Sequence, residues 1–355
     1  MYKTAVARTI RQRRILHDVS LELTYRCNLD CFFCYNDREK AGQLLSVPQY
    51  RVLLEDLARM QTLFLMLTGG EPMIHPYFFE IGRIARDLGF VIRVRTNGHS
   101  LSRRNCERLV DEVAPFMVEV SLHGASAEVH DRQTRVCGSF KRLLANIENA
   151  KQAGLRVAAV STPTAWNQHQ IAEMFDVCDS LDIPLRFQGP VAPRDNGDTA
   201  PLVIQPAEAT WARIAEVQRQ RFDQTAGSRQ QIASEEMAVE ADAETPVTCS
   251  VGTAGVDIDP FGNVQACMHL QEIAGNVHEQ SIEEIWNHSP LFKRARRRAV
   301  DAAQLFTDKP RKQLGAPLIG AHGHYAGCAM DEQAGQQCDD RRFADTGADH
   351  RQGYP

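Results

Sequence analysis

The sequence lacks long apolar stretches, net positive charge and internal repeats. Its longest unbroken apolar run lies near residues 63–67 and is far too short to span a bilayer. No apolar segment of the signal-peptide type stands at its start. We therefore expect a cytoplasmic protein without a membrane partner, whose thiols stay reduced. The net charge of −5 gives no reason to expect a nucleic-acid partner.

Histidine is absent around the densest group of cysteines. Cys27, Cys31 and Cys34 stand in the segment C-N-L-D-C-F-F-C, no histidine lies between residues 18 and 74, and the next cysteine is Cys106. Structural zinc sites usually pair two ligand couples, and a disulfide is not expected in a reducing compartment. Three thiolates can hold three irons of a four-iron cluster and leave the fourth iron open. The loop therefore favours an iron–sulfur reaction centre.

Short apolar runs alternate with helical patterns along the first two-thirds of the chain. This alternation predicts a parallel sheet with right-handed crossovers. Six such units indicate an α/β fold of the partial (β/α)6 TIM-like barrel type, because a closed barrel needs eight. The expected strands cover residues 19–24, 64–67, 91–94, 117–122, 155–160 and 185–188.

Further motifs follow the cysteine loop in a fixed order, most of them directly after an expected strand. They are Leu67-Thr68-Gly69-Gly70-Glu71-Pro72, Thr96-Asn97-Gly98, Ser121-Leu122-His123-Gly124, His130-Asp131 and Gly138-Ser139-Phe140. With the cysteine loop, this ordered set resembles the radical SAM superfamily over about residues 18–340. The resemblance implies a [4Fe-4S] cluster on the three cysteines, with S-adenosylmethionine on the open iron. An external one-electron reductant would drive its cleavage to a 5′-deoxyadenosyl radical, which takes hydrogen from the substrate.

The resemblance also implies roles for single residues around the cofactor. Phe33 would lie against the adenine, although it could be ordinary core, and Ser121 would contact the cofactor, although it could cap a helix. Relatives often carry an arginine near the methionine carboxylate where this chain has Thr134, so we expect Arg132 or Arg135 there. The G-G-E-P segment could be an ordinary turn, but in this context it implies methionine contacts. Gly69 and Gly70 would let backbone approach the methionine moiety, and Glu71 would accept a hydrogen bond from its ammonium group.

A second set of cysteines follows a polar stretch. Cys249 and Cys267 frame an expected β-hairpin over residues 256–264. Their spacing resembles the opening of the SPASM and twitch auxiliary cluster domains, but a full SPASM domain has more cysteines than the remaining Cys328 and Cys338. Four thiolates suffice for one auxiliary [4Fe-4S] cluster. Zinc held by the same four thiolates is the alternative.

The expected organisation along the chain has five parts. They are an N-terminal extension over residues 1–17, a radical SAM partial barrel over 18–205, a linker helix and connector over 206–246, a SPASM/twitch-like auxiliary cluster domain over 247–340 and a C-terminal tail over 341–355. The 17 residues before the first strand leave no room for a leader-binding domain. A leader peptide would therefore be presented by a separate leader-binding protein.

The function that the resemblance implies is an oxidoreductase and peptide maturase. It would abstract hydrogen from a ribosomal peptide or a protein side chain. The residues His269 and Asp257 are candidates for its general base. Two alternatives stay open: the same chemistry on a small-molecule sugar or antibiotic intermediate, and a non-catalytic metal-binding or electron-transfer protein.

Overall fold

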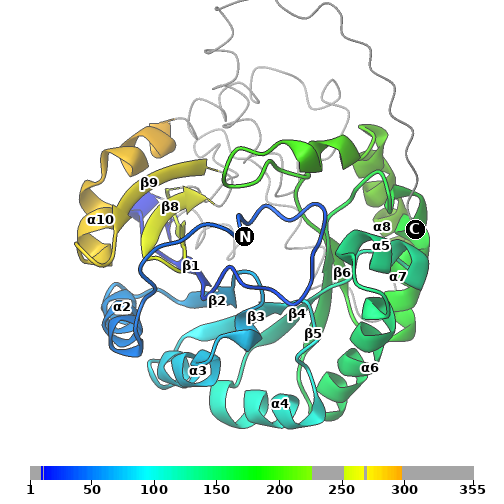
Figure 1. Ribbon diagram of the computed structural model, residues 1–355, viewed down its shortest axis with the longest axis horizontal. Helices are drawn as coiled ribbons and strands as arrows, with labels where there is room; N and C mark the ends of the chain where they lie inside the picture. The colour runs from blue at the N-terminus through cyan, green and yellow to red at the C-terminus, as the bar shows by residue number, and fades with distance from the viewer. Residues whose placement is uncertain (1–8, 11, 226–251, 268–269, 298–355) are drawn as a thin grey trace, which may run out of the picture.

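Six parallel strands form a curved sheet whose outer side is covered by helices (Figure 1). The computed structural model describes residues 9–10, 12–225, 252–267 and 270–297. Each strand pairs in parallel with the next one along the chain, and no pairing closes the ring within the described ranges. The predicted partial barrel is therefore confirmed. Its strands are β1 (Asp18–Glu22), β2 (Phe64–Thr68), β3 (Val91–Thr96), β4 (Met117–Ser121), β5 (Val157–Ser161) and β6 (Leu185–Phe187).

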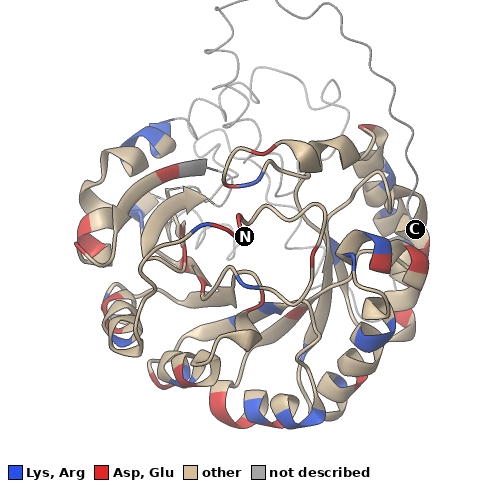
Figure 2. Cartoon of the chain, in the orientation of Figure 1, with Lys and Arg blue, Asp and Glu red and all other residues tan. Residues whose placement is uncertain are grey.

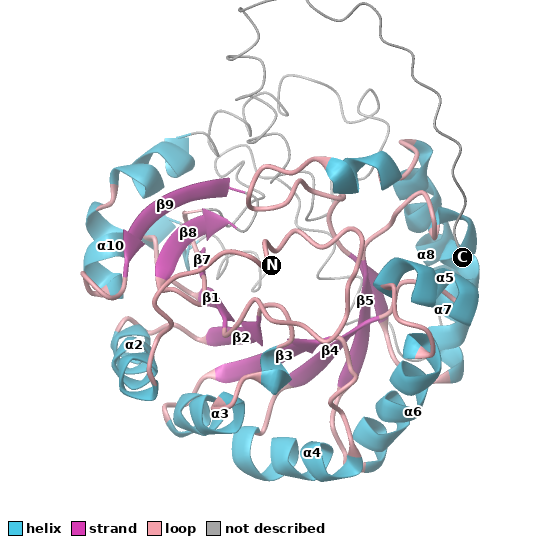
Figure 3. Cartoon of the chain, viewed as in Figure 1, coloured by secondary structure: helices cyan, strands magenta, loops and turns pink. Residues whose placement is uncertain are grey.

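The helices lie outside this sheet, as Figure 3 shows. None of those described is both long and apolar enough to cross a membrane. The helix after β3 begins as α4 and ends in a π-helical segment at Leu109–Val113. The helices are α2 (Val47–Arg59), α3 (Phe78–Asp87), α4 (Arg103–Arg108), α5 (Ala127–Thr134), α6 (Ser139–Gln152), α7 (Ile171–Ser180) and α8 (Ala209–Thr225).

Alternate residues of the strands build the core between the sheet and its helices. Leu67, Val94 and Val120 are fully buried and join helix residues such as Leu54 and Ile81 in one apolar cluster. Because side chains alternate across a strand, the residues between them face the concave side of the sheet. The core is thus on the convex side, which leaves the concave side for polar groups.

A C-terminal hairpin extends the same sheet beyond β1. Strand β7 (Gly255–Ile258) pairs in parallel with β1, and β8 (Asn263–Cys267) and β9 (Leu270–Asn276) follow in antiparallel order. The predicted hairpin is confirmed, but its first strand is part of the barrel sheet. Helix α10 (Ile282–His288) lies beside β9, and its Trp286 indole donates a hydrogen bond to the Arg14 carbonyl at 2.9 Å.

Charged residues lie on the strands of the sheet as well as on the outer helices, as the colours in Figure 2 show. The Glu119 carboxylate on β4 is fully buried and lies 2.5 Å from Arg95, 2.7 Å from Arg186 and 3.8 Å from Arg93. These contacts place side chains of β3, β4 and β6 on one surface inside the curved sheet. The interior is therefore a polar space with paired charges and not an apolar barrel core.

Candidate active site

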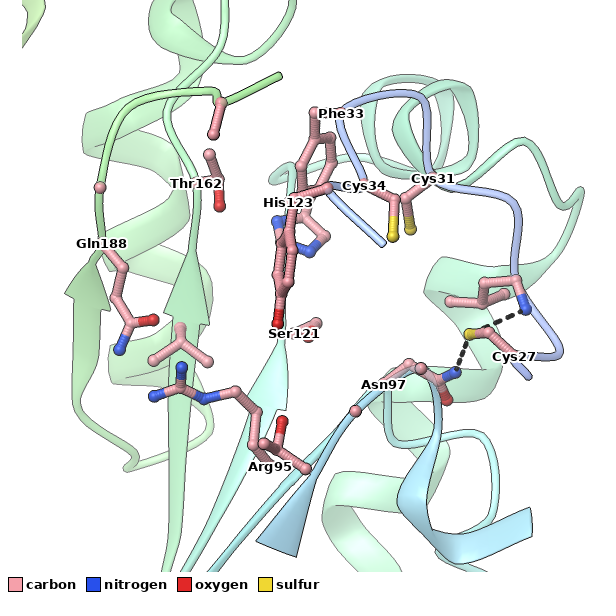
Figure 4. Close-up of a pocket in the computed structure, with 18 of the residues that line it drawn as sticks. Cys27, Cys31, Phe33, Cys34, Arg95, Asn97, Ser121, His123, Thr162 and Gln188 are labelled. Carbon is pink, nitrogen blue, oxygen red and sulfur yellow. Dashed lines mark hydrogen bonds between the residues drawn. The ribbon is translucent and has the colours of Figure 1, made fainter. Parts of the chain in front are cut away.

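A cavity of about 220 Å³ opens where the parallel strands end. Its walls come from the cysteine loop after β1 and from the loops after the other strands of the barrel (Figure 4). Functional residues gather at the carboxyl ends of parallel strands because these ends meet at one edge of the sheet. The lining residues used below are Tyr25, Cys27, Cys31, Phe33, Cys34, Tyr35, Arg38, Gly69, Gly70, Arg95, Asn97, Ser121, His123, Thr162 and Gln188.

The three cysteines of the first loop all line this cavity. The backbone N–H of Leu29 donates to Sγ of Cys27 at 3.4 Å, and the N–H of Cys34 donates to the Cys31 carbonyl at 3.1 Å. Burial raises the pKa of each of the three thiols. The thiolate form therefore needs cationic neighbours, which the irons of a bound cluster would supply.

The arrangement of these thiols suits a cluster better than a single metal ion. Two thiolates on one zinc ion lie about 3.8 Å apart, given tetrahedral geometry and Zn–S bonds of about 2.3 Å. In the described part of the chain, no three His, Cys, Asp or Glu side chains converge as ligands of one ion. Figure 4 shows Cys27 apart from Cys31 and Cys34. A four-iron cluster distributes its thiolates over different irons, so the three residues fit it.

Arg38 is a cation beside the cysteine loop that the sequence analysis missed. Its guanidinium donates to the Leu29 carbonyl and lies 3.3 Å from the Asp30 carboxylate, so it spans the segment between Cys27 and Cys31. The same positive charge acts to lower the pKa of the three thiols against the effect of burial. No motif marks this residue, because its role depends on how the loop folds back.

Gly69 and Gly70 approach the backbone that leads into the cysteine loop. The N–H of Gly70 donates to the Thr24 carbonyl at 2.6 Å, and a Cβ on Gly70 would lie 2.4 Å from the Arg26 carbonyl oxygen. Gly69 has a φ of 124° and would place its Cβ 2.5 Å from the Thr24 oxygen. Both glycines line the cavity, but the close approach that requires them is to the protein's own backbone.

Glu71 lies behind the cavity wall, although we expected it to meet the methionine ammonium group. Its carboxylate is fully buried and accepts hydrogen bonds from the Thr96 hydroxyl at 2.8 Å, the Asn97 N–H at 2.8 Å and the Met73 N–H at 3.1 Å. Burial raises its pKa to about 7. The geometry favours a positioning role, in which Glu71 ties the loops after β2 and β3 together.

Asn97 extends this network to the cysteine loop. Its side-chain Nδ2 donates to the Asn28 side-chain oxygen at 2.7 Å and to Sγ of Cys27 at 3.6 Å (Figure 4). Glu71 holds the Asn97 backbone and Asn97 holds Cys27, so the G-G-E-P segment and the cysteine loop form one hydrogen-bonded unit. Hydrogen bonds to ligand sulfurs are among the factors that set cluster potentials.

Phe33 and Ser121 lie in the cavity wall, where their expected cofactor contacts would require them. The Phe33 ring meets the His123 ring edge-on at 4.7 Å between centroids, and Phe33 is only half-buried. Ser121 is the last residue of β4, and Ser126 caps α5 instead, so the helix-cap alternative for Ser121 is wrong. The cofactor contacts of both residues stay predictions.

Neither expected arginine lines the cavity. The Arg132 guanidinium lies over the Trp166 ring at 4.3 Å, and Arg135 lies over the Phe32 ring at 4.7 Å. Arg135 also contacts the Asp30 carboxylate at 3.4 Å. Arg135 thus contacts the cysteine loop, Arg132 contacts Trp166 beside it, and a role of either arginine at the methionine carboxylate stays a prediction. The arginines that do line the cavity are Arg38 and Arg95.

The second set of cysteines lies mostly beyond the described ranges. Cys249, Cys328, Cys338 and the base candidate His269 fall outside them, whereas Cys267 is buried at the end of β8. The other base candidate, Asp257, sits on β7 opposite Ser20 of β1 and does not line the cavity. The structure therefore does not bring Asp257 to the cavity surface.

A buried acidic group stands at the end of β1. The Glu22 carboxylate accepts a hydrogen bond from the Tyr35 hydroxyl at 2.7 Å, and Tyr35 lines the cavity. Burial, opposed by that hydrogen bond and aided by the charges of Asp257, Asp195 and Asp259, raises the pKa of Glu22 to about 8. The carboxyl group is thus mainly protonated at neutral pH.

Replacing Glu22 with glutamine is expected to flatten the dependence of stability on pH. The raised pKa means that the folded state keeps a proton which the unfolded state loses above about pH 4.5. The wild type therefore loses free energy of unfolding as pH rises toward 8, by at most about 2 kcal/mol between pH 6 and 7.5 from this group. Urea unfolding of the cluster-free protein at several pH values measures the difference. An identical slope in both proteins would contradict the assignment.

Comparison with known proteins adds two family matches. Residues 21–179 match the model of the radical SAM superfamily, and residues 249–311 match the model of the iron–sulfur cluster-binding domain SPASM. The AdoMet-dependent heme synthase of Methanosarcina barkeri is 29% identical over 298 residues, which cover 78% of this chain and 84% of that protein. The mycofactocin maturase MftC of Mycobacterium ulcerans is 28% identical over 346 residues, or 92% of this chain and 86% of that one. The PqqA peptide cyclase of Rhodopseudomonas palustris is 26% identical over a stretch that covers 78% of this chain and 75% of that protein.

Two solved structures share the fold. Streptococcus suis SuiB bound to S-adenosylmethionine has a TM-score of 0.66 at 15% identity, covering 82% of this chain and 70% of that chain. The protein anSMEcpe with bound AdoMet has a TM-score of 0.63 at 14% identity, covering 79% and 83%. At these identities the likeness concerns the arrangement of the barrel and its extension.

Proposed function

The chain belongs to the radical SAM superfamily and carries a SPASM-type domain, and we propose that it couples reductive cleavage of S-adenosylmethionine to hydrogen abstraction from a peptide. The observation that carries this proposal is the single cavity that three cysteine thiols share with the strand ends of the barrel. A reaction centre needs an open position next to a space for substrate: a four-iron cluster on three thiols would keep one iron open, and the cavity supplies the space beside them.

When bound at the cysteine loop, the [4Fe-4S] cluster and S-adenosylmethionine supply the one-electron chemistry and the 5′-deoxyadenosyl radical. The protein's own residues position and shield that chemistry. Glu71 and Asn97 fix the loop that carries Cys27. The ring of Phe33 and the imidazole of His123 form an adjoining wall, and burial lowers the pKa of His123 to about 3, so this wall stays neutral.

The peptide substrate is supported by the relatives and by one loop of the cavity. MftC and the PqqA cyclase are named as a maturase and a peptide cyclase, and they align with most of this chain. The loop after β6 contains Pro193-Arg194-Asp195-Asn196-Gly197, a P-R-x-x-G segment that resembles one found in the peptide-modifying branch. Its residues 188–192 line the cavity, and the Asp195 N–H donates to the Tyr35 carbonyl at 2.8 Å. This loop therefore joins the cysteine loop to the substrate space.

A second candidate substrate is a small molecule. The alignment with the heme synthase of M. barkeri covers 84% of that protein, which favours testing a heme precursor beside peptides.

We further propose one auxiliary [4Fe-4S] cluster on Cys249, Cys267, Cys328 and Cys338, because four thiolates satisfy it. An external one-electron reductant and a separate leader-binding protein complete the proposed partners.

Anaerobic incubation with candidate precursor peptides, S-adenosylmethionine and a reductant tests the function. We expect a mass change in one peptide that depends on S-adenosylmethionine, with 5′-deoxyadenosine formed alongside it. The same mixture without peptide, and one with a heme precursor, are the controls. If the heme precursor is converted and none of the peptides is modified, the peptide assignment is refuted, while the superfamily chemistry stands.

A further inference from the structure

We propose that the cavity wall opposite the cysteine loop is a carboxylate-binding subsite, where Arg95 and Gln188 receive a carboxylate of the peptide substrate. This carboxylate belongs to an acidic side chain or to the C-terminus of the peptide. The inference rests on the proposed peptide-modifying function and names the chemical feature by which the site selects its substrate.

Arg95 has donor capacity left over for a ligand. It lies near the end of β3, its side chain is 22% exposed, and it lines the cavity. Nε and Nη2 both donate to one oxygen of Glu119, at 3.0 Å and 2.5 Å. Its third nitrogen, Nη1, has no hydrogen-bond partner among the residues that the structure describes. A guanidinium has five N–H donors, so a carboxylate can be bound without breaking the contact to Glu119.

The charges around Arg95 leave a cation in excess. Three arginines surround the Glu119 carboxylate, and the further acid near them, Asp18, lies 3.7 Å from Arg93. Arg93 makes these two long ion pairs and lies over the Phe64 ring at 6.0 Å, and its Nε is buried without a hydrogen-bond partner in the described ranges. The three guanidinium groups outnumber the two carboxylates that contact them. Clefts of this kind attract counter-charge strongly.

Gln188 supplies a second polar group to the same wall. Its backbone N–H is held by the Ser161 carbonyl at 2.8 Å, whereas its side-chain amide has no partner in the described ranges. Figure 4 shows the Arg95 side chain extending toward the wall that carries Gln188 and Thr162, across the cavity from Cys31. A charged donor and a neutral amide facing one space are suited to the two oxygens of a carboxylate.

The carboxylate of S-adenosylmethionine is not the expected occupant. The cluster would be held by the cysteine loop, which lies on the other side of the cavity from Arg95 (Figure 4), and its open iron would bind that carboxylate there. Arg38 stands on that side and lines the cavity there. The two arginines thus lie on opposite walls of the cavity, so Arg95 can bind the substrate.

Binding of short capped peptides to the cluster-loaded protein with S-adenosylmethionine tests the subsite. Each acid is compared with its amide twin: acetyl-alanyl-alanine with its C-terminal amide, and acetyl-glutamyl-alanine amide with acetyl-glutaminyl-alanine amide. We expect wild type to prefer the acid roughly tenfold in at least one pair, since a charge-assisted hydrogen bond contributes about 1.5–3 kcal/mol. The pair that shows the preference identifies the source of the carboxylate.

Arg95→Gln should reduce this preference to within about twofold. Arg186→Gln is the matched control, because Arg186 also contacts Glu119 at 2.7 Å but does not line the cavity. It should keep the preference, which separates recognition from damage to the network around Glu119. Affinity for S-adenosylmethionine should stay unchanged in Arg95→Gln.

Three results would overturn the subsite. They are equal binding of both members of each pair by wild type, an acid preference that survives in Arg95→Gln, and a loss of S-adenosylmethionine affinity in that variant. Failure of the proposed function is detected by a different measurement: the mass-spectrometric screen would then find no modified peptide. A modified peptide whose binding ignores its carboxylates refutes the subsite alone.

Discussion

Cys31→Ala is expected to abolish cleavage of S-adenosylmethionine. Cys31 lines the cavity between Cys27 and Cys34, and its loss leaves two thiolates for a cluster that needs three from this loop. Anaerobically reconstituted wild type should carry about eight irons in two four-iron clusters, and the variant about four. Release of 5′-deoxyadenosine under reducing conditions should fall to the background of the reagents.

Cys137→Ala is the matched control for this variant. Cys137 is exposed and does not line the cavity, so its removal lowers the cysteine count without touching the site. It should keep both the iron content and the nucleoside release of wild type. Undiminished release from Cys31→Ala would refute the assignment of this loop as the reaction centre.

Gly70→Ala is expected to displace the cysteine loop. The added Cβ would lie 2.4 Å from the Arg26 oxygen and 2.6 Å from the Tyr25 oxygen, and both atoms belong to backbone that cannot rotate away. Relief of this clash must separate the two segments and break the hydrogen bond from the Glu71 N–H to Arg26, now 2.9 Å long. We expect a loss of roughly 1–3 kcal/mol of unfolding free energy, together with most of the iron at this loop.

Gly154→Ala separates the general cost of alanine from this specific clash. Gly154 has a φ of 83° and no atom within 4 Å of a built Cβ, so only backbone strain of about 1 kcal/mol is expected. Iron content and nucleoside release should match wild type in this control. Full iron loading and full activity in Gly70→Ala would show that the two segments need not approach so closely.

The barrel and the cluster loop could be predicted because their signals are local in sequence. Apolar runs alternating with helical patterns indicate parallel strands regardless of what surrounds them. The spacing of Cys27, Cys31 and Cys34 likewise lies within one loop. The cavity at the strand ends followed from the topology, since the loops after parallel strands meet at one edge.

Contacts that join distant parts of the chain could not be predicted in this way. Asn97 reaches Cys27 over 70 residues, and Arg186 reaches Glu119 over 67. No sequence pattern around either residue of such a pair predicts the residue that it contacts. The same limit applies to Glu71. Its motif indicates where a functional segment lies, but whether the side chain faces a ligand or the protein depends on its hydrogen bonds to Thr96 and Asn97.

The surroundings of the expected arginines could not be read from the motif either. Arg132 and Arg135 are close in sequence to the expected position, but their guanidinium groups stack on Trp166 and Phe32. Cation–π contacts of this kind depend on how α5 packs against the cysteine loop, which no local pattern in the sequence specifies. Arg38 and Arg95 reach the cavity instead, one from the cysteine loop and one from a strand.

Electron–nuclear double resonance on the reduced protein tests the central claim most directly. The claim is that the cluster at Cys27, Cys31 and Cys34 has one iron free to bind S-adenosylmethionine. With ¹⁷O in the carboxylate of S-adenosylmethionine, we predict a hyperfine coupling to the reduced cluster that is absent in Cys31→Ala. A fully iron-loaded wild type that binds the labelled cofactor and shows no such coupling would contradict the account.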